Sequence, residues 1–560
     1  MLKRLLLLLM LASPVAASAQ SADGFFTPVS YKGAFGGSNW LEGWTALSAK
    51  GYLAPTTSGQ TKVQVTDASI NAGDNVRWTS NNIYVLNGVV LVEEGATLTI
   101  ESGTTVQGEL GNGNRASALV IGRGGKLFAE GTSARPIVFT SVLDDGSLTY
   151  QDRGLWGGVV VLGRATTNNP TTGGEKQIEG LNEIIGTRAL YGGTDDNDAS
   201  GILRHVSIRH TGINVGDQAG NEIQGLTLGG VGRGTVIEYI ESFASADDGF
   251  EFFGGTVDTK YLVSAFNEDD SFDWDEGFRG RGQFWFSLQA TDKGGRAGEF
   301  DGATNNEFYT PYAIPVLSNV TFIGPGLGAT TAGDGAEMII FRDNSGGKIY
   351  NSIFTEYQAA SGGKAVTVED VADNTTITTD SRQRLEAGDL VLSNNLWWQF
   401  GAGNTVNTFA TQAWVQAHLA AQPNSVIDPA LRGIDRDAPN ATLDPRPAPG
   451  SPALSGAMAV VGTAIETTAG EILDGFVLDQ NYPNPFNPST TIEFGLDRSE
   501  MVRLSVYDLL GREVAVLVND VQSAGTYRVS FDATDLASGV YLYRLATGAG
   551  SVSRRMVLMK

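Results

Sequence analysis

The hydrophobic positions of this chain fall into short alternating runs, and one phrase of the pattern occurs twice. Residues 246–277 read ADDGFEFFGGTVDTKYLVSAFNEDDSFDWDEG. The second copy follows the first by 22 residues and matches Asp247-Asp248 with Asp269-Asp270, Phe250 with Phe272, Glu251 with Asp273, and Phe252 with Trp274. Repetition at such a period, in short β-type runs separated by Gly and Asn, predicts a stacked β-coil.

Within each copy, aromatic and acidic residues alternate, so they are expected on opposite faces of a strand. If each copy is one coil, equivalent residues lie about 4.8 Å apart in successive coils. The aromatic side chains would then stack inside the coil, and the carboxylates would form an external ladder. We call this set the acidic ladder; it consists of Asp247, Asp248, Glu251, Asp269, Asp270 and Asp273.

The same β pattern extends over most of the chain and predicts a coil from residue 62 to 455. Short apolar runs at 83–86, 89–92, 118–121 and 137–140 are separated by turn residues, and similar runs recur up to 390–396. Apolar residues at helical spacing predict one short helix over 410–421. Long polar stretches at 167–202, 291–312 and 360–385 are expected to be excursions from the coil.

Three stretches resemble the opening coils of a known family. They read GVVLVEEGATLTIESGTTVQG, LVIGRGGKLFAEGTSARPIVFTS and GLWGGVVVLGRA, and they include Arg135-Pro136-Ile137 followed by Trp156. They are similar to bacterial right-handed parallel β-helix proteins of the pectate-lyase-like type. The resemblance implies an all-β fold for 62–455, but it specifies an activity poorly.

The N-terminus has the pattern of a signal peptide over residues 1–19. Lys3 and Arg4 precede an apolar run from Leu5 to Leu11, and Ala17-Ser18-Ala19 offers a cleavage site. Residues 20–61 are aromatic-rich and are expected to be a capping segment at an open end of the coil. No later stretch is apolar for long enough to span a bilayer, so we expect an exported mature chain without a transmembrane segment. The absence of cysteine excludes a disulfide framework.

The C-terminal part has a different composition. Residues 456–474 form a small-residue linker, and the strand spacing over 475–560 predicts a small Ig-like antiparallel β-sandwich. The segments NYPNPFNPSTTIEF, VYDLLGREV, SGVYLYRL and RRMVLMK strongly resemble the type A sorting domain of the Bacteroidetes type IX secretion system. That resemblance implies the type IX machinery as a partner, and display at the outer-membrane surface or release.

The chain is strongly acidic, and the acids are concentrated around the repeated phrase. The net charge is −24 with an isoelectric point near 4.5, which argues against nucleic acid as a partner. Residues 241–282 carry eleven acids and three bases, a net charge of 3 − 11 = −8. Two carboxylates at coil spacing repel by roughly 3–4 kcal/mol at an effective dielectric near 20. The ladder is therefore a hydrated acidic face, a cation site for which Ca²⁺ is the best match, or a catalytic site.

Two functions remain open. The leading hypothesis is a surface protein that adheres to or binds glycan without turnover. The alternative is a calcium-dependent polysaccharide lyase or a glycoside hydrolase acting on acidic polysaccharide. For a lyase, the resemblance implies a basic residue near the cation, and the candidates are Lys260, Arg279 and Arg281. Trp285, predicted to face away from Phe284 and Phe286, is the candidate sugar-stacking residue. The plainer interpretations are that Arg279 and Arg281 balance the charge of the ladder, and that Trp285 is a partly exposed packing residue.

Overall fold

The chain divides into two compact units, built on residues 28–460 and 461–560, and each is described by itself. The computed structural model describes residues 25–48, 59–168, 174–178, 180–215, 221–303, 307–326, 329, 335–357, 362–371, 380–436 and 443–460 of the chain's first part. In its last part it describes 477–478, 481, 484, 486–496, 500–507, 512–522, 525–534, 536–547 and 550–560. The predicted signal peptide and most of the predicted linker lie outside these residues.

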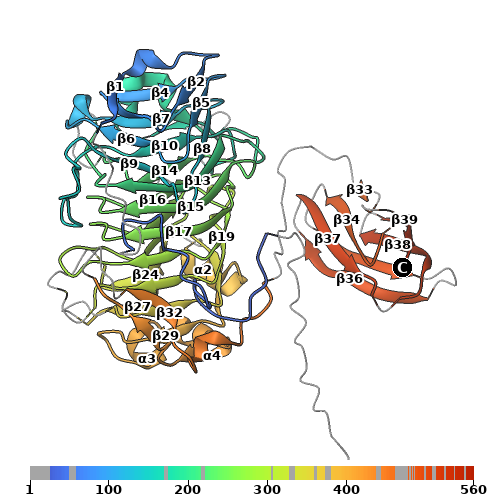
Figure 1. Ribbon diagram of the computed structural model, residues 1–560. Coiled ribbons are helices and arrows are strands. Elements are labelled where there is room, and N and C mark those ends of the chain that lie inside the picture. The colour runs from blue at the N-terminus through green and yellow to red at the C-terminus, as the bar shows by residue number, and fades with distance from the viewer. Residues whose placement is uncertain are drawn as a thin grey trace, which may run out of the picture. The chain divides into compact units, whose positions relative to one another are not determined.

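One parallel sheet contains nine strands over the described residues, and its strands follow one another in chain order (Figure 1). They are β4 (Val89–Val92), β7 (Ala118–Ile121), β10 (Val159–Leu162), β14 (Leu226–Gly229), β16 (Phe250–Phe253), β18 (Phe272–Asp275), β21 (Gly298–Asp301), β24 (Glu337–Arg342) and β27 (Lys364–Val368). Each strand pairs with the equivalent strand of the next coil. Two neighbouring strands joined by a short turn would be antiparallel. Because these neighbouring strands are parallel, the chain must pass once around the core between one strand and the next.

A second parallel sheet of 19 described strands forms the other two walls of the coil. Its first column consists of β2 (Asn75–Trp78), β5 (Thr97–Ile100), β8 (Lys126–Glu130), β19 (Arg281–Gln283), β22 (Val316–Ser318), β25 (Gly347–Tyr350) and β28 (Leu390–Ser393). Its second column consists of β1 (Thr61–Val65), β3 (Asn82–Leu86), β6 (Thr105–Gly108), β9 (Ile137–Ser141), β20 (Phe286–Leu288), β23 (Thr321–Ile323), β26 (Ile353–Thr355), β29 (Leu396–Trp398) and β30 (Ser425–Val426). Three long strands run through both columns: β13 (Gly201–Arg209), β15 (Val236–Phe243) and β17 (Thr259–Ala265).

The chain bends between the two columns at residues with positive φ. His205, Tyr239, Tyr261 and Phe284 occupy this position in successive coils, with φ between 47° and 61°. Such a backbone is unusual for residues other than glycine, and it turns the side chain outward at the corner. Their rings stack along the corner, with centroids 4.4 Å apart for His205–Tyr239 and 4.2 Å apart for Tyr239–Tyr261. Stacking between neighbouring coils offsets the strain of the bends.

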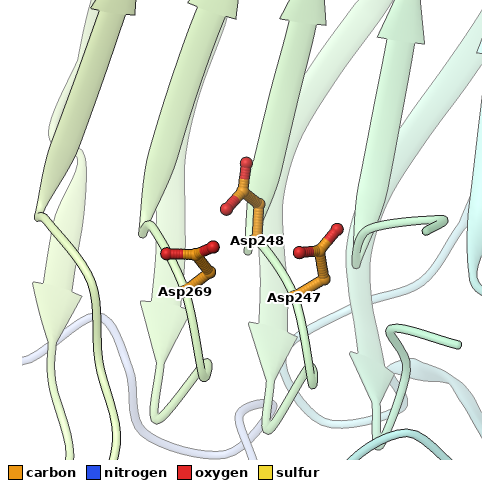
Figure 2. A group of neighbouring side chains, drawn as sticks. All are labelled: Asp247, Asp248 and Asp269. Atoms are coloured by element: carbon orange, nitrogen blue, oxygen red, sulfur yellow. The ribbon is translucent and has the colours of Figure 1, made fainter. Parts of the chain in front are cut away.

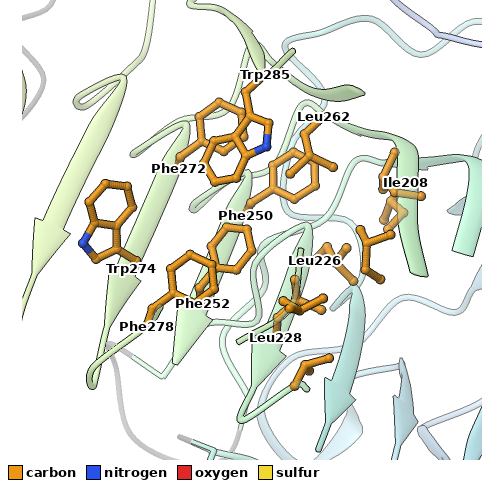
Figure 3. Close-up of a cluster of buried hydrophobic side chains, with 14 of the residues drawn as sticks. Ile208, Leu226, Leu228, Phe250, Phe252, Leu262, Phe272, Trp274, Phe278 and Trp285 are labelled. Atoms are coloured by element: carbon orange, nitrogen blue, oxygen red, sulfur yellow. The ribbon is translucent and has the colours of Figure 1, made fainter. Parts of the chain in front are cut away.

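The two copies of the repeated phrase lie in neighbouring coils in the predicted register. Phe250 pairs with Phe272, Glu251 with Asp273, and Phe252 with Trp274. The four aromatic side chains are fully buried, and the Phe250 and Phe272 rings stack with centroids 5.3 Å apart (Figure 3). The expected all-β coil is confirmed, and its core is continuous from Val65 to Leu419.

The N-terminal segment does not cap the end of the coil as predicted. Its described residues 28–48, which we call the strap, lie along the flank of the second column. The backbone N–H of Ala34 donates to Thr321 Oγ1 at 2.8 Å, and Phe35 and Trp44 pack in one cluster with Phe286. The prediction was wrong because this flank carries outward-facing apolar side chains in the middle of the coil, and burying them favours the strap there.

Short elements decorate the coil. The predicted helix over 410–421 is present as α4 (Ala413–Ala421), and a further short helix, α3 (Val406–Phe409), precedes it. The excursions contain α1 (Leu181–Ile185), the hairpin β11 (Lys176–Gln177) and β12 (Leu190–Tyr191), and α2 (Ser381–Ala387); a further hairpin is β31 (Leu431–Gly433) and β32 (Asp444–Pro447). The 3₁₀ turns are Asp67–Ser69, Gly113–Arg115, Gly186–Ala189 and Pro452–Leu454.

The C-terminal unit consists of two antiparallel sheets around one apolar core, as an Ig-like sandwich requires. One sheet contains β33 (Val477–Leu478), β34 (Ser489–Leu496) and β37 (Gly525–Asp532). The other contains β35 (Glu500–Tyr507), β36 (Glu513–Gln522), β38 (Gly539–Thr547) and β39 (Gly550–Leu558). Among the described residues of both units, no helix has the length and apolar character needed to cross a membrane.

Candidate functional site

The acidic ladder lies on the outer side of the nine-stranded sheet. Its strand members, Glu251 and Asp273, sit side by side on β16 and β18. Its other members lie in the turns that precede these strands. Figure 2 shows Asp248 between Asp247 and Asp269, with the three carboxylates close together. The doubled phrase therefore gathers six carboxylates within two coils.

Two carboxylate triads are close enough to hold a metal ion. Asp247, Asp248 and Asp269 each offer an oxygen within 4.8 Å of the others, and so do Asp248, Glu251 and Asp273. Asp248 belongs to both triads. All the ligand atoms are carboxylate oxygens, which are the donors that Ca²⁺ prefers. The residue types and their spacing therefore fit a hard divalent cation.

Two members of the ladder also brace the turns. Asp248 Oδ1 accepts the backbone N–H of Asp270 at 2.9 Å, and the carboxylate of Asp270 accepts the backbone N–H of Arg296. Each aspartate thus holds the turn of the following coil. Each of these two hydrogen bonds needs only an acceptor oxygen, so neither requires the aspartate to be negatively charged.

The ladder is less solvated than the external face that one interpretation of the sequence predicts. Asp248 is 8% exposed and Asp270 is 3% exposed. Gly295, from the excursion that follows β20, lies so close that a Cβ there would be 2.3 Å from an oxygen of Asp269. On the neighbouring part of the sheet, Tyr191 from another excursion donates to Glu276 at 2.7 Å. The excursions thus cover part of the ladder: Asp248, Glu251 and Asp270 are buried, whereas Asp247, Asp269 and Asp273 remain partly exposed.

Burial and mutual repulsion raise the pKa values of four members of the ladder. Burial, followed by the charges of Asp269 and Glu222, raises the pKa of Asp247 to about 7. The pKa values of Asp248, Asp270 and Asp273 are raised well above the ordinary range, again mainly by burial and then by neighbouring carboxylates. A cation at this position would favour the charged forms instead.

The structure adds a third coil to the ladder that the sequence reasoning missed. Glu299 on β21 pairs in register with Asp273, and Asp301 follows two residues later. Arg342 on β24 contacts both, with nitrogen–oxygen distances of 2.7 Å to Glu299 and 2.7 Å to Asp301. Arg296 bridges Glu299 and Glu337 on the same flank. The Glu-Phe-Asp alternation at 299–301 was a readable signal, whereas the arginines come from tertiary folding.

The three predicted basic catalytic residues do not gather on the ladder. Lys260 lies on β17 of the other sheet, in register with Glu238. Arg281, on β19 of that sheet, donates from Nε to Asp258 Oδ1 at 2.9 Å. Arg279 Nη1 lies 3.3 Å from Oδ2 of Asp196, which belongs to the excursion over residues 167–202. Each arginine balances the charge of an aspartate outside the ladder, so the interpretation of Arg279 and Arg281 as charge balance for the ladder is wrong as well.

The prediction that Trp285 stacks against sugar is wrong. Trp285 is fully buried, its ring stacks on Phe272 with centroids 4.7 Å apart, and its N–H donates to Thr259 Oγ1 at 2.9 Å (Figure 3). The positive φ of Phe284, 61°, breaks the strand alternation just before it. Trp285 therefore turns inward, and Phe284 and Phe286 face the flank under the strap.

Comparison with known protein families finds a matching family model for each of the two units. The model of the family described as a pectate-lyase-like β-helix domain matches residues 69–420, more than half of the chain. The chain therefore belongs to this family. The model of a secretion system C-terminal sorting domain matches residues 480–559. Because the chain carries this sorting domain, the type IX secretion machinery is a partner of the protein. The protein is exported to the cell surface or the extracellular space.

Other comparisons add little. No curated protein matches the sequence. Among solved structures, full-length tailspike protein 2 of Escherichia coli O157:H7 bacteriophage CAB120 is similar at 9% identity and a TM-score of 0.21. The match covers 85% of this chain and 64% of the tailspike chain. A similarity this low carries no argument about fold or function.

Proposed function

We propose that this exported β-helix is a glycan-binding protein of the cell surface, braced by Ca²⁺ on the acidic ladder. The observation that carries the calcium part is the pair of carboxylate triads that share Asp248. Export and the β-helix fold put a long, rigid surface outside the cell, which suits adhesion to an extended polymer.

The ladder fits a cation by its donor chemistry. Every ligand in the two triads is a carboxylate, and Ca²⁺ takes six to eight oxygens, including backbone carbonyls and waters. Among the described residues, the buried Oδ1 of Asp273 has no hydrogen-bond partner. An acceptor buried without a donor is costly, and a cation would offset this cost together with the repulsion between the acids.

Binding without turnover is supported by where the bases lie. A lyase needs a base beside the cation and an open path for the sugar chain. Arg296 and Arg342, which do lie beside the ladder, are each paired with acids. Asp248 and Asp270 are covered, so a sugar chain reaches them only if the excursion around Gly295 moves. The arrangement favours a structural cation over a catalytic one.

The test is to incubate the full chain with uronic-acid polysaccharides, with Ca²⁺ or with a chelator, and to measure both bound glycan and released product. The proposal predicts glycan affinity and no product in either condition. Calcium-dependent formation of unsaturated sugar ends would establish the lyase alternative, and calcium-independent release of reducing ends would establish a hydrolase. A chain that binds none of the polysaccharides would refute the glycan-binding proposal.

A further inference from the structure

The stretch with which the chain leaves the coil lies against the strap. This stretch, residues 451–458, is called the tail below. The backbone N–H of Lys32 donates to the carbonyl of Ala453 at 2.7 Å, and the backbone N–H of Ala457 donates to the carbonyl of Ser30 at 3.1 Å. The tail therefore pairs with a segment from the opposite end of the unit's sequence.

A row of asparagines at the corner between the two columns holds both segments. Asn319, Asn351 and Asn394 occupy this corner in successive coils with φ between 55° and 60°, a left-handed backbone that asparagine tolerates. The side-chain amide of Asn319 donates to the carbonyl of Tyr31 in the strap at 2.7 Å. The side chain of Asn351 accepts the N–H of Met458 in the tail at 2.8 Å and donates to its carbonyl at 2.9 Å. One row of side chains thus anchors the strap and the tail side by side.

Gly33 brings the backbone of the strap close to the coil. Its φ is 80°, and a Cβ at this position would lie 2.5 Å from Ile353 Cδ1 and 2.7 Å from Thr321 Oγ1. Its backbone N–H donates to the carbonyl of Asn351 at 2.7 Å. Only glycine combines this backbone with so little space. Ile353 on β26 also packs against Ala453 of the tail, so the strap and the tail share the surface of one side chain.

The surface that the strap occupies is assembled from several coils. Glu241 on β15 accepts the N–H of Ala46 at 2.7 Å. The ring of Phe286 on β20 meets the ring of Phe35 edge to face, with centroids 5.1 Å apart. Thr321 on β23 accepts a further N–H of the strap at 2.8 Å. Because these strands belong to different coils, an incomplete coil lacks part of this surface. The strap precedes the coil in the sequence, but it can dock fully only after these coils have formed.

We propose that the strap is a latch on the tail: it docks on the completed coil, and once docked it keeps the tail in place. The tail leads to the second unit, which carries the sorting domain. The latch thereby links the folding of the coil to the exposure of the stretch that joins the coil to the sorting domain. This inference goes beyond the proposed glycan binding and depends neither on it nor on the acidic ladder.

The experiment measures hydrogen exchange at single backbone amides of the full chain, together with limited proteolysis. Gly33→Ala lifts the first part of the strap, because its Cβ has no room and its φ is positive. The matched control is Gly37→Ala, also in the strap, where a Cβ meets no atom within 4 Å. A second variant, Asn351→Gly, suits the positive φ but removes the side chain that holds Met458. Thermal unfolding of each variant checks that the coil remains folded.

In Gly33→Ala, the amides of Ala457 and Met458 are expected to exchange at least about tenfold faster than in the wild type, because the tail loses two backbone hydrogen bonds to the strap. Proteases are expected to cut within the tail of this variant and to leave the tail of Gly37→Ala intact. The amide of Met458 is decisive, because its hydrogen bond goes to the coil and not to the strap. Wild-type exchange of this amide in Gly33→Ala would overturn the latch.

The second variant tests the coupling from the other side. A coupling free energy acts in both directions, so Asn351→Gly is expected to speed exchange at Ala34, whose amide donates to Thr321 on the coil. Wild-type exchange of Ala34 in Asn351→Gly would overturn the latch, and in Gly33→Ala it would overturn the close fit on which the latch rests. Loss of cooperative unfolding in Gly33→Ala would also contradict the proposal, because a latch leaves the coil itself intact.

Discussion

Glu241 on β15 accepts a hydrogen bond from Ala46 of the strap, although the two residues lie 195 positions apart in the sequence. The fully buried Glu241 Oε2 accepts the backbone N–H of Ala46 at 2.7 Å, and Oε1 accepts that of Leu47 at 3.0 Å. Burial raises the pKa of Glu241, and the nearby Arg209 guanidinium opposes this shift. One carboxylate from β15 thus anchors the end of the strap.

We predict that Glu241→Ala destabilises the unit by about 3–5 kcal/mol, because it removes one member of a buried charged network. It also leaves the backbone donors of Ala46 and Leu47 without their acceptor. Glu241→Gln keeps an acceptor oxygen and is expected to cost less. The measurement is denaturant unfolding, together with limited proteolysis of the strap. Wild-type stability and proteolysis of Glu241→Ala would show that the strap does not depend on this anchor.

The stability of the coil is expected to fall in mild acid because of His205. Burial and the charge of Arg204 lower the pKa of His205 from its ordinary value to about 4, and Glu238 opposes the shift. The ring stacks on Tyr239 and meets the edge of Trp44. Since the unfolded chain binds the proton more tightly, stability is complete above about pH 6.5 and declines as the pH falls toward 4.

The loss attributed to His205 is at most about 3 kcal/mol, from about 1.36 kcal/mol per pKa unit. The variant His205→Phe keeps a stacking ring without the titrating nitrogen, so its stability should fall less between pH 7 and pH 4 than that of the wild type. Thermal unfolding at several pH values gives the two curves. Parallel curves would show that His205 does not contribute.

Trp285 is predicted to act in the core and not in ligand binding. Trp285→Ala should cost about 3–5 kcal/mol, as expected for emptying a buried aromatic site, and Trp285→Phe should cost less. In both variants the folded protein should retain the glycan affinity of the wild type. A Trp285→Ala protein with normal unfolding but reduced affinity would restore the sugar-stacking hypothesis.

The register of the coil was predictable because the sequence repeats itself. Matching Phe250 with Phe272 and Glu251 with Asp273 at constant spacing fixes which residues meet, since slipping by one residue would put the carboxylates in the core. The same spacing brings Asp248 close to Asp269 and Asp273 of the next coil. The sorting domain was equally readable, because its strands and turns are contiguous in sequence.

Other features of the site were not predictable from local patterns. Trp285 lies inside because Phe284 adopts a left-handed backbone, and nothing in the alternation announces that bend. The covering of the ladder by Gly295 and the contacts of Arg342 join residues from different coils and excursions.

The central claim is that the acidic ladder holds Ca²⁺, and its most direct test is thermal unfolding of the chelated full chain with added Ca²⁺. The account predicts a rise in the unfolding midpoint, with stabilisation of about 3 kcal/mol when Ca²⁺ is a hundredfold above its dissociation constant. The variant Asp248→Asn keeps an acceptor for the Asp270 N–H but removes the charge shared by both triads, so its rise should be largely lost. The control Glu94→Gln, at an exposed residue paired with Arg164, should respond like the wild type. No shift of the wild-type midpoint at millimolar Ca²⁺, or an undiminished shift in Asp248→Asn, would contradict the account.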